Sequence, residues 1–179
     1  MRQDGAKGLS AKSRKKLNKM IEKSLVIIKP DGVERALVGG IIKRFENAGL
    51  KIIGMKMLWI DKKFAEEHYK AHSSKPFFKE LVEFITEGPV VAFVVEGVHA
   101  VDNVRRLVGS TSPHEAAPGT IRGDFAHLSM AYASKKGLGG KNVVHASGSK
   151  KEAELRHNQH ALHGLLSVWG LQLSGHSQA

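Results

Sequence analysis

The 179-residue chain contains no cysteine. Disulfide bonds and thiolate metal sites are therefore excluded, and a reducing compartment is expected. No apolar run approaches the roughly 18 residues of a membrane span, and the N-terminus lacks the uninterrupted apolar segment of a secretory signal. We therefore expect a cytoplasmic protein with no membrane span, made of one domain with appendages.

Acidic residues are scarce relative to basic ones, 17 against 28, which gives a formal net charge of +11. Much of the excess lies in residues 1–23, which hold eight basic and two acidic side chains. This basic N-terminal extension fits an arm that binds nucleic acid. It also fits a solvated, partly helical or disordered extension, the interpretation that the sequence favours. The smaller excess in the rest of the chain suits a protein that handles a small anionic substrate.

Apolar patterns predict strands and helices in alternation. Strands are expected at 24–28, 51–60, 90–95 and just before His145, and helices from Val38 to Gly49 and at 62–72, 77–87 and 100–108. A turn is expected at 29–32 and a loop at 109–124. The order resembles the split β-α-β, ferredoxin-like pattern, βαββαβ. The fold class is therefore α+β, a four-stranded antiparallel sheet covered by helices, expected on one face.

His145 follows two β-branched residues and precedes a run of small residues, Ala146-Ser147-Gly148-Ser149. This pattern predicts a short buried strand that ends in a tight turn. This arrangement fixes an imidazole at the end of a rigid element, and a neutral imidazole at pH 7 is a good nucleophile, able to take a group and pass it on. The alternative is a structural histidine satisfied by a hydrogen bond, which this segment alone favours.

Polar side chains capable of binding a phosphate chain lie at the ends of other predicted elements. They are Lys29, Arg105, Thr111, Arg122 and Asn142. Phosphate recognition uses such groups: guanidiniums for bidentate contacts, a lysine as a point charge, a hydroxyl and an amide. Each alone fits a surface residue, but the set together with His145 favours a phosphate site.

From Ser24 to about Ala153 the chain resembles the nucleoside diphosphate kinase family. The motifs that carry the resemblance occur in the family's order: 26–33 (VIIKPDGV), 37–46 (LVGGIIKRFE), 67–69 (EHY), 75–78 (KPFF), 88–92 (GPVVA), 118–125 (PGTIRGDF) and 142–147 (NVVHAS). So many ordered matches leave little room for chance. The family-like domain is expected to span 24–157.

The resemblance implies transfer of the γ-phosphate of ATP or another nucleoside triphosphate to a nucleoside diphosphate, by a ping-pong route through phosphorylated His145. It implies that Lys29 and Tyr69 belong to the catalytic centre and that Lys29, Phe77, Arg105, Thr111, Arg122 and Asn142 bind the nucleotide. It also implies Mg²⁺ held through the nucleotide phosphates, without protein side chains as ligands, and a homo-oligomer, hexamer or tetramer.

The chain departs from the family pattern near its active-site motif. Residues 126–141 form an insertion of about ten residues, for which a mobile loop near the pocket is expected. Gly148 replaces an acidic residue, and Arg156 stands where the family has a glutamate that orients the imidazole. The alternative function is therefore a catalytically weakened member that binds nucleotides or, through residues 1–23, nucleic acid.

The C-terminal tail, 158–179, is also atypical of the family. From His157 onward the chain has no Lys, Arg, Asp or Glu, but it contains His157, His160, His163 and His176. A metal-binding histidine cluster would fit this composition. A shift of the reading frame near residue 155 would fit it as well, and would also account for Arg156.

Overall fold

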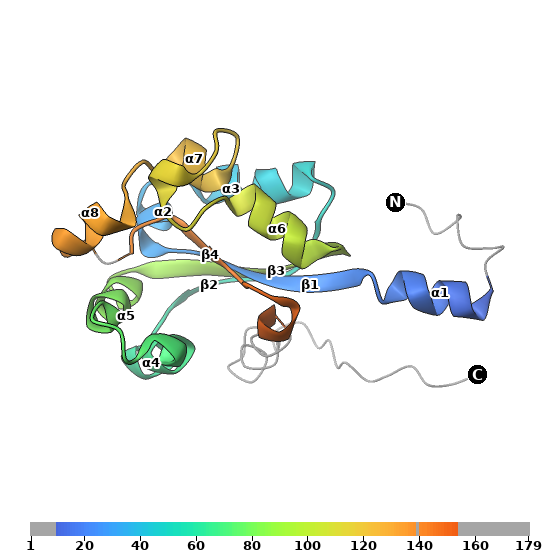
Figure 1. Ribbon diagram of the computed structural model, residues 1–179, viewed down its shortest axis with the longest axis horizontal. Coiled ribbons are helices and arrows are strands. Elements are labelled where there is room, and N and C mark those ends of the chain that lie inside the picture. The colour runs from blue at the N-terminus through green and yellow to red at the C-terminus, as the bar shows by residue number, and fades with distance from the viewer. Residues whose placement is uncertain (1–9, 139, 154–179) are drawn as a thin grey trace.

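A computed structural model of the chain describes residues 10–138 and 140–153 (Figure 1). Its centre is a sheet of four strands in the order β2-β3-β1-β4, and every neighbouring pair is antiparallel. The strands are β1 (Ile21–Ile28), β2 (Lys51–Trp59), β3 (Pro89–Val98) and β4 (Val144–Ala146). The predicted α+β fold with a four-stranded antiparallel sheet is confirmed.

The described helices are α1 (Ala11–Asn18), α2 (Pro30–Glu34), α3 (Val38–Asn47), α4 (Lys62–His68), α5 (Phe78–Thr86), α6 (Ala100–Val108), α7 (Ile121–Phe125) and α8 (Met130–Lys135). Two short 3-10 helices cover Lys70–His72 and Pro113–Glu115. Side-chain oxygens cap four of the described helices: Ser10 accepts from Ser13 N–H at α1, Asp61 from Phe64 N–H at α4, Thr120 from Gly123 N–H at α7 and Ser129 from Tyr132 N–H at α8. Such caps satisfy amide groups that have no partner within the helix.

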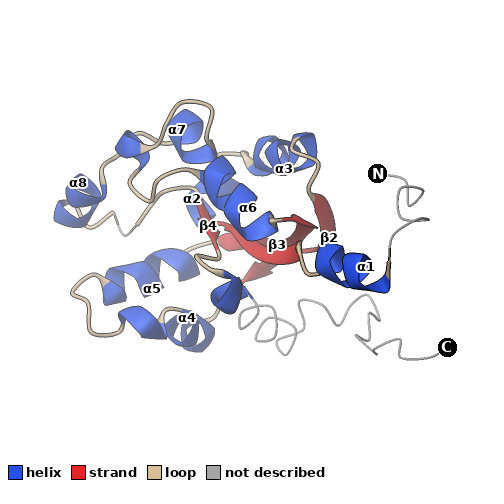
Figure 2. Cartoon of the chain, turned by 45° about the vertical axis from the view of Figure 1, so that its right-hand side comes forward, coloured by secondary structure: helices blue, strands red, loops and turns tan. Residues whose placement is uncertain are grey.

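Helices cover both faces of the sheet, so the expectation of a single covered face was wrong (Figures 1 and 2). Side chains of a strand alternate between its faces. Val26 and Ile28 of β1 join a cluster with α3 and α6, whereas Leu25 and Ile27 join a second cluster with α4 and α5. The inner strands β1 and β3 are apolar at successive positions because both faces of the sheet are buried there.

Several local expectations also change. Residues 29–32, predicted as a turn, open helix α2, which begins at Pro30 because proline is tolerated in a first helical turn. The predicted loop 109–124 contains α7 and a 3-10 helix, and the stretch 126–141, expected as a mobile loop, contains α8. In the N-terminal extension, α1 has no buried residue, and β1 begins at Ile21.

Two of the sequence expectations fall on residues that the structure does not describe. They are Arg156 and the tail 158–179, which lie outside the described residues. Within the described ranges, no helix has both the length and the apolar character needed to cross a bilayer.

Candidate active site

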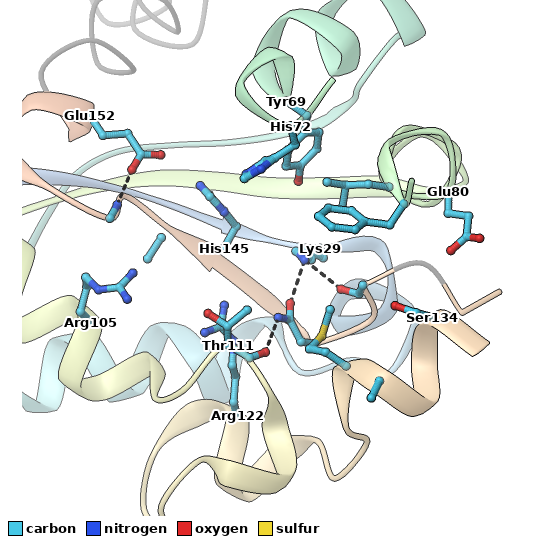
Figure 3. A pocket seen from close by; sticks show the side chains of 18 residues that line it. Lys29, Tyr69, His72, Glu80, Arg105, Thr111, Arg122, Ser134, His145 and Glu152 are labelled. Atoms are coloured by element: carbon cyan, nitrogen blue, oxygen red, sulfur yellow. Dashed lines mark hydrogen bonds between the residues drawn. The ribbon is translucent and has the colours of Figure 1, made fainter. Parts of the chain in front are cut away.

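A cavity of about 540 Å³ opens at the ends of β1 and β4. The site residues expected from the sequence all line it: Lys29, Tyr69, Phe77, Arg105, Thr111, Arg122, Asn142 and His145 (Figure 3). They come from strands, helices and loops that are distant in the sequence. The structure therefore brings the whole expected set to one cavity.

His145 is held at the centre of β4, where it pairs with Ile27 of β1. Its neighbours Val144 and Ala146 are buried, so the strand cannot rotate without exposing them. On the cavity side, the His145 ring lies 5.4 Å from the ring of His68 and 6.5 Å from the ring of Tyr69, measured between centroids. Both contacts are edge-to-face, a favoured arrangement of rings. The imidazole is thus fixed in direction by the sheet and by neighbouring rings.

The turn before His145 is strained. Val143 has a φ of 72°, which is unfavourable for a β-branched residue. Its N–H donates to Asp31 Oδ2 at 3.0 Å, and its carbonyl accepts from the Lys29 N–H at 2.8 Å. Burial raises the pKa of the Asp31 carboxyl, whereas the charge of Lys29 opposes that rise. Backbone strain of this kind persists where the surroundings fix it, and it concentrates at functional sites.

Lys29 directly follows β1, at the N-cap of α2, and is buried, although it lines the cavity. Its Nζ donates to Asn142 Oδ1 at 2.7 Å and to the Gly140 carbonyl at 2.9 Å. Burial, together with the charge of Arg122, lowers the pKa of Lys29 to about 7, while Asp31 acts against this shift. An anion bound beside Lys29 would favour its charged form. The residue is therefore suited to a phosphate group.

Asn142 connects Lys29 to the loop that carries Thr111. Its amide nitrogen donates to the Thr111 carbonyl at 2.9 Å while its oxygen accepts from Lys29. Because both ends of the amide are used, Asn142 is fixed in orientation. The side chain thereby sets the position of the loop that carries Thr111.

Arg122 is a buried residue of α7, and its hydrogen bonds connect backbone segments that line the cavity. Its Nη atoms donate to the carbonyls of Gly109, Ser110 and Val144 at 3.0, 3.1 and 2.7 Å. Burial and the nearby charge of Arg105 lower the pKa of Arg122 to about 10, so it stays cationic at neutral pH. Arg105 is exposed on α6. Together with Lys29, the guanidiniums of Arg105 and Arg122 make the part of the cavity that they line electropositive.

Glu152 lines the same cavity, although sequence reasoning did not include it in the site. Its Oε2 accepts from the Gly148 N–H at 2.7 Å, and its own N–H donates to Ser149 Oγ at 3.2 Å. A Cβ at position 148 would approach Oε2 to 2.8 Å, so this placement depends on Gly148. The spacing Ser149-x-x-Glu152, typical of a capping box, was the available signal. An acidic group therefore reaches the pocket despite the loss of the acid at 148.

The described part of the chain contains no cluster of potential metal ligands. Within residues 10–138 and 140–153, no group of three or more His, Cys, Asp or Glu side chains could hold an ion. The cavity instead gathers cationic side chains, which suit the phosphates of a substrate.

Comparison with known proteins identifies the family. The family model for nucleoside diphosphate kinase matches residues 22–160. The chain belongs to the nucleoside diphosphate kinase family. It is 55% identical over 134 residues to the nucleoside diphosphate kinase of Pyrococcus furiosus, and the alignment covers 75% of this chain and 79% of that protein. The corresponding protein of Archaeoglobus fulgidus is 57% identical over 134 residues, with coverage of 75% and 82%.

Solved structures agree with this family assignment. A transition-state mimic of nucleoside diphosphate kinase from Borrelia burgdorferi, with bound vanadate and ADP, superposes with a TM-score of 0.73. The two chains are 43% identical, and the superposition covers 76% of this chain and 84% of the Borrelia burgdorferi chain. The predicted family, its α+β fold and its enzyme class, phosphotransfer between nucleotides, are thereby confirmed. Members of this family use a divalent cation for catalysis.

Proposed function

We propose that this chain transfers the γ-phosphate of a nucleoside triphosphate to a nucleoside diphosphate through a phosphohistidine at His145. The observation that supports it most strongly is the placement of His145 on a buried strand, facing a cavity that also holds Lys29, Arg105 and Arg122. Phosphoryl transfer depends mainly on positioning and on neutralisation of phosphate charge. This cavity offers both.

In the first half-reaction, a lone pair on an imidazole nitrogen of His145 attacks the γ-phosphorus. The bond from that phosphorus to the bridging oxygen breaks, and the nucleoside diphosphate leaves with the electron pair. In the second, a terminal oxygen of the acceptor diphosphate attacks the phosphohistidine. The nitrogen–phosphorus bond breaks, and its electron pair returns to the imidazole. A covalent intermediate lets one site serve donor and acceptor in turn.

The side chains have distinct proposed roles. Lys29 and Arg122 neutralise phosphate oxygens from the cavity floor, and Arg105 approaches from its rim. Thr111 and Asn142 contact phosphate or sugar, Phe77 stacks on the base, and Tyr69 supports the histidine. The substrate enters as its Mg²⁺ complex, with the ion held by the phosphates.

The test is incubation with ATP labelled at the γ-phosphate. We expect label that is stable to alkali and labile to acid on the wild type, and none on His145→Gln. His114→Gln is the matched control, because this exposed histidine lies in the 3-10 helix Pro113–Glu115, outside the cavity. A wild type that takes no label, or a His145→Gln variant that still does, overturns the proposal.

A nucleic-acid-binding role remains a second proposal, favoured by α1. This helix presents Lys12, Arg14, Lys15 and Lys16 and buries none of its residues. Changing Lys12, Lys15 and Lys16 to Gln should weaken binding to duplex DNA. It should also reduce the slope of log K against log salt by about 0.9 per lost contact. A slope equal to that of the wild type contradicts the role. Phosphorylation of His145 tests the enzyme separately.

We further propose a homo-oligomer, hexamer or tetramer, in the cytoplasm. The edge strand β2 exposes a stripe of large apolar side chains, with Met55, Met57 and Trp59 at 48%, 58% and 65% exposure. An unpaired edge with apolar side chains favours pairing with another chain. Light scattering should give a multiple of the 19.5 kDa chain, and Met57→Lys should lower it. A monomeric wild type contradicts the assembly.

A further inference from the structure

The cavity differs in charge from one end to the other. Figure 3 shows Arg105 and His145 toward one end and Glu80 and Ser134 toward the opposite end, with Lys29 between them. Glu152, the other acidic lining residue, lies on the Arg105 side in the same view. A nucleotide bound with its phosphates at the cationic end would place its base toward Glu80.

The wall opposite α5 at this end is helix α8, which belongs to the inserted stretch 126–141. Met130, Ala131 and Ser134 of α8 line the cavity, as do Phe77 and Leu81 from the α5 side. Phe77 is 40% exposed, so its ring is available to a ligand. Aromatic and apolar side chains on two walls suit a planar base, which stacks on a ring and excludes water.

Contacts hold the start of helix α8 and the chain beyond its end beside the cavity. At its start, the Met130 N–H donates to Ser112 Oγ at 3.2 Å, next to Thr111. Ala133 is buried. Beyond its end, the Gly140 carbonyl accepts from Lys29, and Lys141 Nζ lies 3.2 Å from Glu87 Oε1 at the end of α5. These contacts and the buried Ala133 keep α8 beside the cavity, where it can hold a ligand group in a defined position.

Glu80 is a half-buried acid at this end of the cavity. Within residues 10–138 and 140–153, no hydrogen bond or ion pair engages its carboxylate. A carboxylate accepts two parallel N–H donors well. Guanine presents two such donors side by side, the ring N1–H and the 2-amino group. Adenine and cytosine present one amino group beside an acceptor nitrogen, and uracil presents its N–H between two carbonyls.

We propose that α5 and α8 form a two-sided slot for the base and that Glu80 gives this slot a preference for guanine nucleotides. The inference rests on the proposed nucleotide site and adds a specificity to it. In the bound state, the Glu80 carboxylate accepts from the guanine N1–H and 2-amino group. The ring lies between Phe77 and Met130, and its phosphates lie at the cationic end.

The test uses protein first phosphorylated on His145 and freed of nucleotide. Discharge is then timed in single turnovers with GDP, ADP and CDP. We expect the wild type to discharge to GDP about fivefold faster or more than to CDP at subsaturating concentration. Glu80→Gln should lose most of this advantage, because an amide nitrogen then faces the guanine donors. Discharge to CDP should change less than discharge to GDP, because cytosine does not present two adjacent donors to the carboxylate.

Glu83→Gln is the matched control, because Glu83 lies on the same helix, pairs with Lys79 at 3.8 Å and does not line the cavity. It should keep the preference for GDP. Equal discharge by GDP and CDP in the wild type, or an undiminished preference in Glu80→Gln, overturns the inference. Failure of the proposed function is distinct, because His145 would then take no phosphate from ATP.

Two variants on helix α8 test whether this helix forms one wall of the base slot. Met130→Ala removes apolar contact from the slot and should raise the dissociation constant of every nucleoside diphosphate about fivefold. Tyr132→Ala, on the same helix but 50% exposed and outside the cavity, should leave it unchanged. Equal constants for both variants contradict α8 as a wall of the base slot.

Discussion

The cavity has two ends that are built in different ways: the proposed phosphate end, near Lys29 and Arg122, and the proposed base end, near Phe77 and Ser134. At the phosphate end, Lys29, Arg122 and Asn142 are buried, and each makes hydrogen bonds that tie it to backbone or to another side chain. At the base end, Phe77 and Ser134 lie on helices or their flanks and are exposed. Phosphoryl transfer requires fixed geometry, whereas stacking tolerates small displacements. Substitutions at the two ends should therefore fail in different ways.

The largest effect is expected at Lys29. Lys29→Met removes a cation from the phosphate end, and kcat/KM should fall about 10²- to 10³-fold for every nucleotide. Lys23→Met is the control, because Lys23 lies on β1, the strand that leads into Lys29, but does not line the cavity and pairs with Glu96 at 4.0 Å. Steady-state rates with several nucleotides give the comparison. A loss at Lys29 no larger than at Lys23 contradicts the assignment.

The pH dependence should report the same residue. The pKa of Lys29 is lowered to about 7, so Lys29 is charged below that pH and neutral above it. Since kcat/KM reports the free enzyme, it should fall as pH rises through about 7. Bound phosphate favours the charged form, so kcat should fall only at higher pH. A basic limb that persists unchanged in Lys29→Met would show that another group titrates.

Asn142 should show a smaller effect. Asn142→Ala leaves a buried donor of Lys29 and the Thr111 carbonyl without their partner, which should cost about 1–3 kcal/mol of unfolding free energy. Urea denaturation measures this loss. Asn142→Asp supplies a carboxylate beside Lys29 and should move the basic limb of kcat/KM to higher pH. An Asn142→Asp profile that coincides with the wild type contradicts the coupling.

The smallest effect is expected at the base end. Phe77→Ala should raise KM for nucleoside diphosphates about tenfold, with kcat nearly unchanged, because one stacking contact is lost. Ribose triphosphate without a base should phosphorylate His145 equally well in both proteins. If Phe77→Ala slows that base-free reaction, the two ends are not independent and the comparison fails.

The ordered family motifs predicted the residues of the phosphate end and Phe77 of the base end, but they did not predict Glu80 or Ser134. Lys29, Arg122, Asn142 and His145 follow or precede recognisable elements within ordered motifs, so their convergence could be predicted. Glu80 and Ser134 line the same cavity from α5 and α8, and no local pattern joins residues so distant in the chain. Helix α8 was also expected as a loop, because the surrounding lysines and glycines hid its short capped turn.

Local sequence also predicted the strands of the sheet better than the helices that cover its two faces. Its strands follow from runs of β-branched residues, but the second layer of helices does not follow from any single strand. In β1 the successive residues Leu25 and Val26 are both buried, which signals two covered faces only once the flanking helices are placed. The turn 29–32 was mistaken because Pro and Gly favour turns, although proline also starts helices.

The ping-pong route through His145 is tested most directly by a two-step experiment. The protein is phosphorylated with ATP, freed of all nucleotide, and mixed with a nucleoside diphosphate in a single turnover. We expect loss of the phosphoryl group from His145 and formation of nucleoside triphosphate at the same rate and in equal amount. A phosphoprotein that is not discharged, or triphosphate that forms only when ATP is also present, would contradict the account.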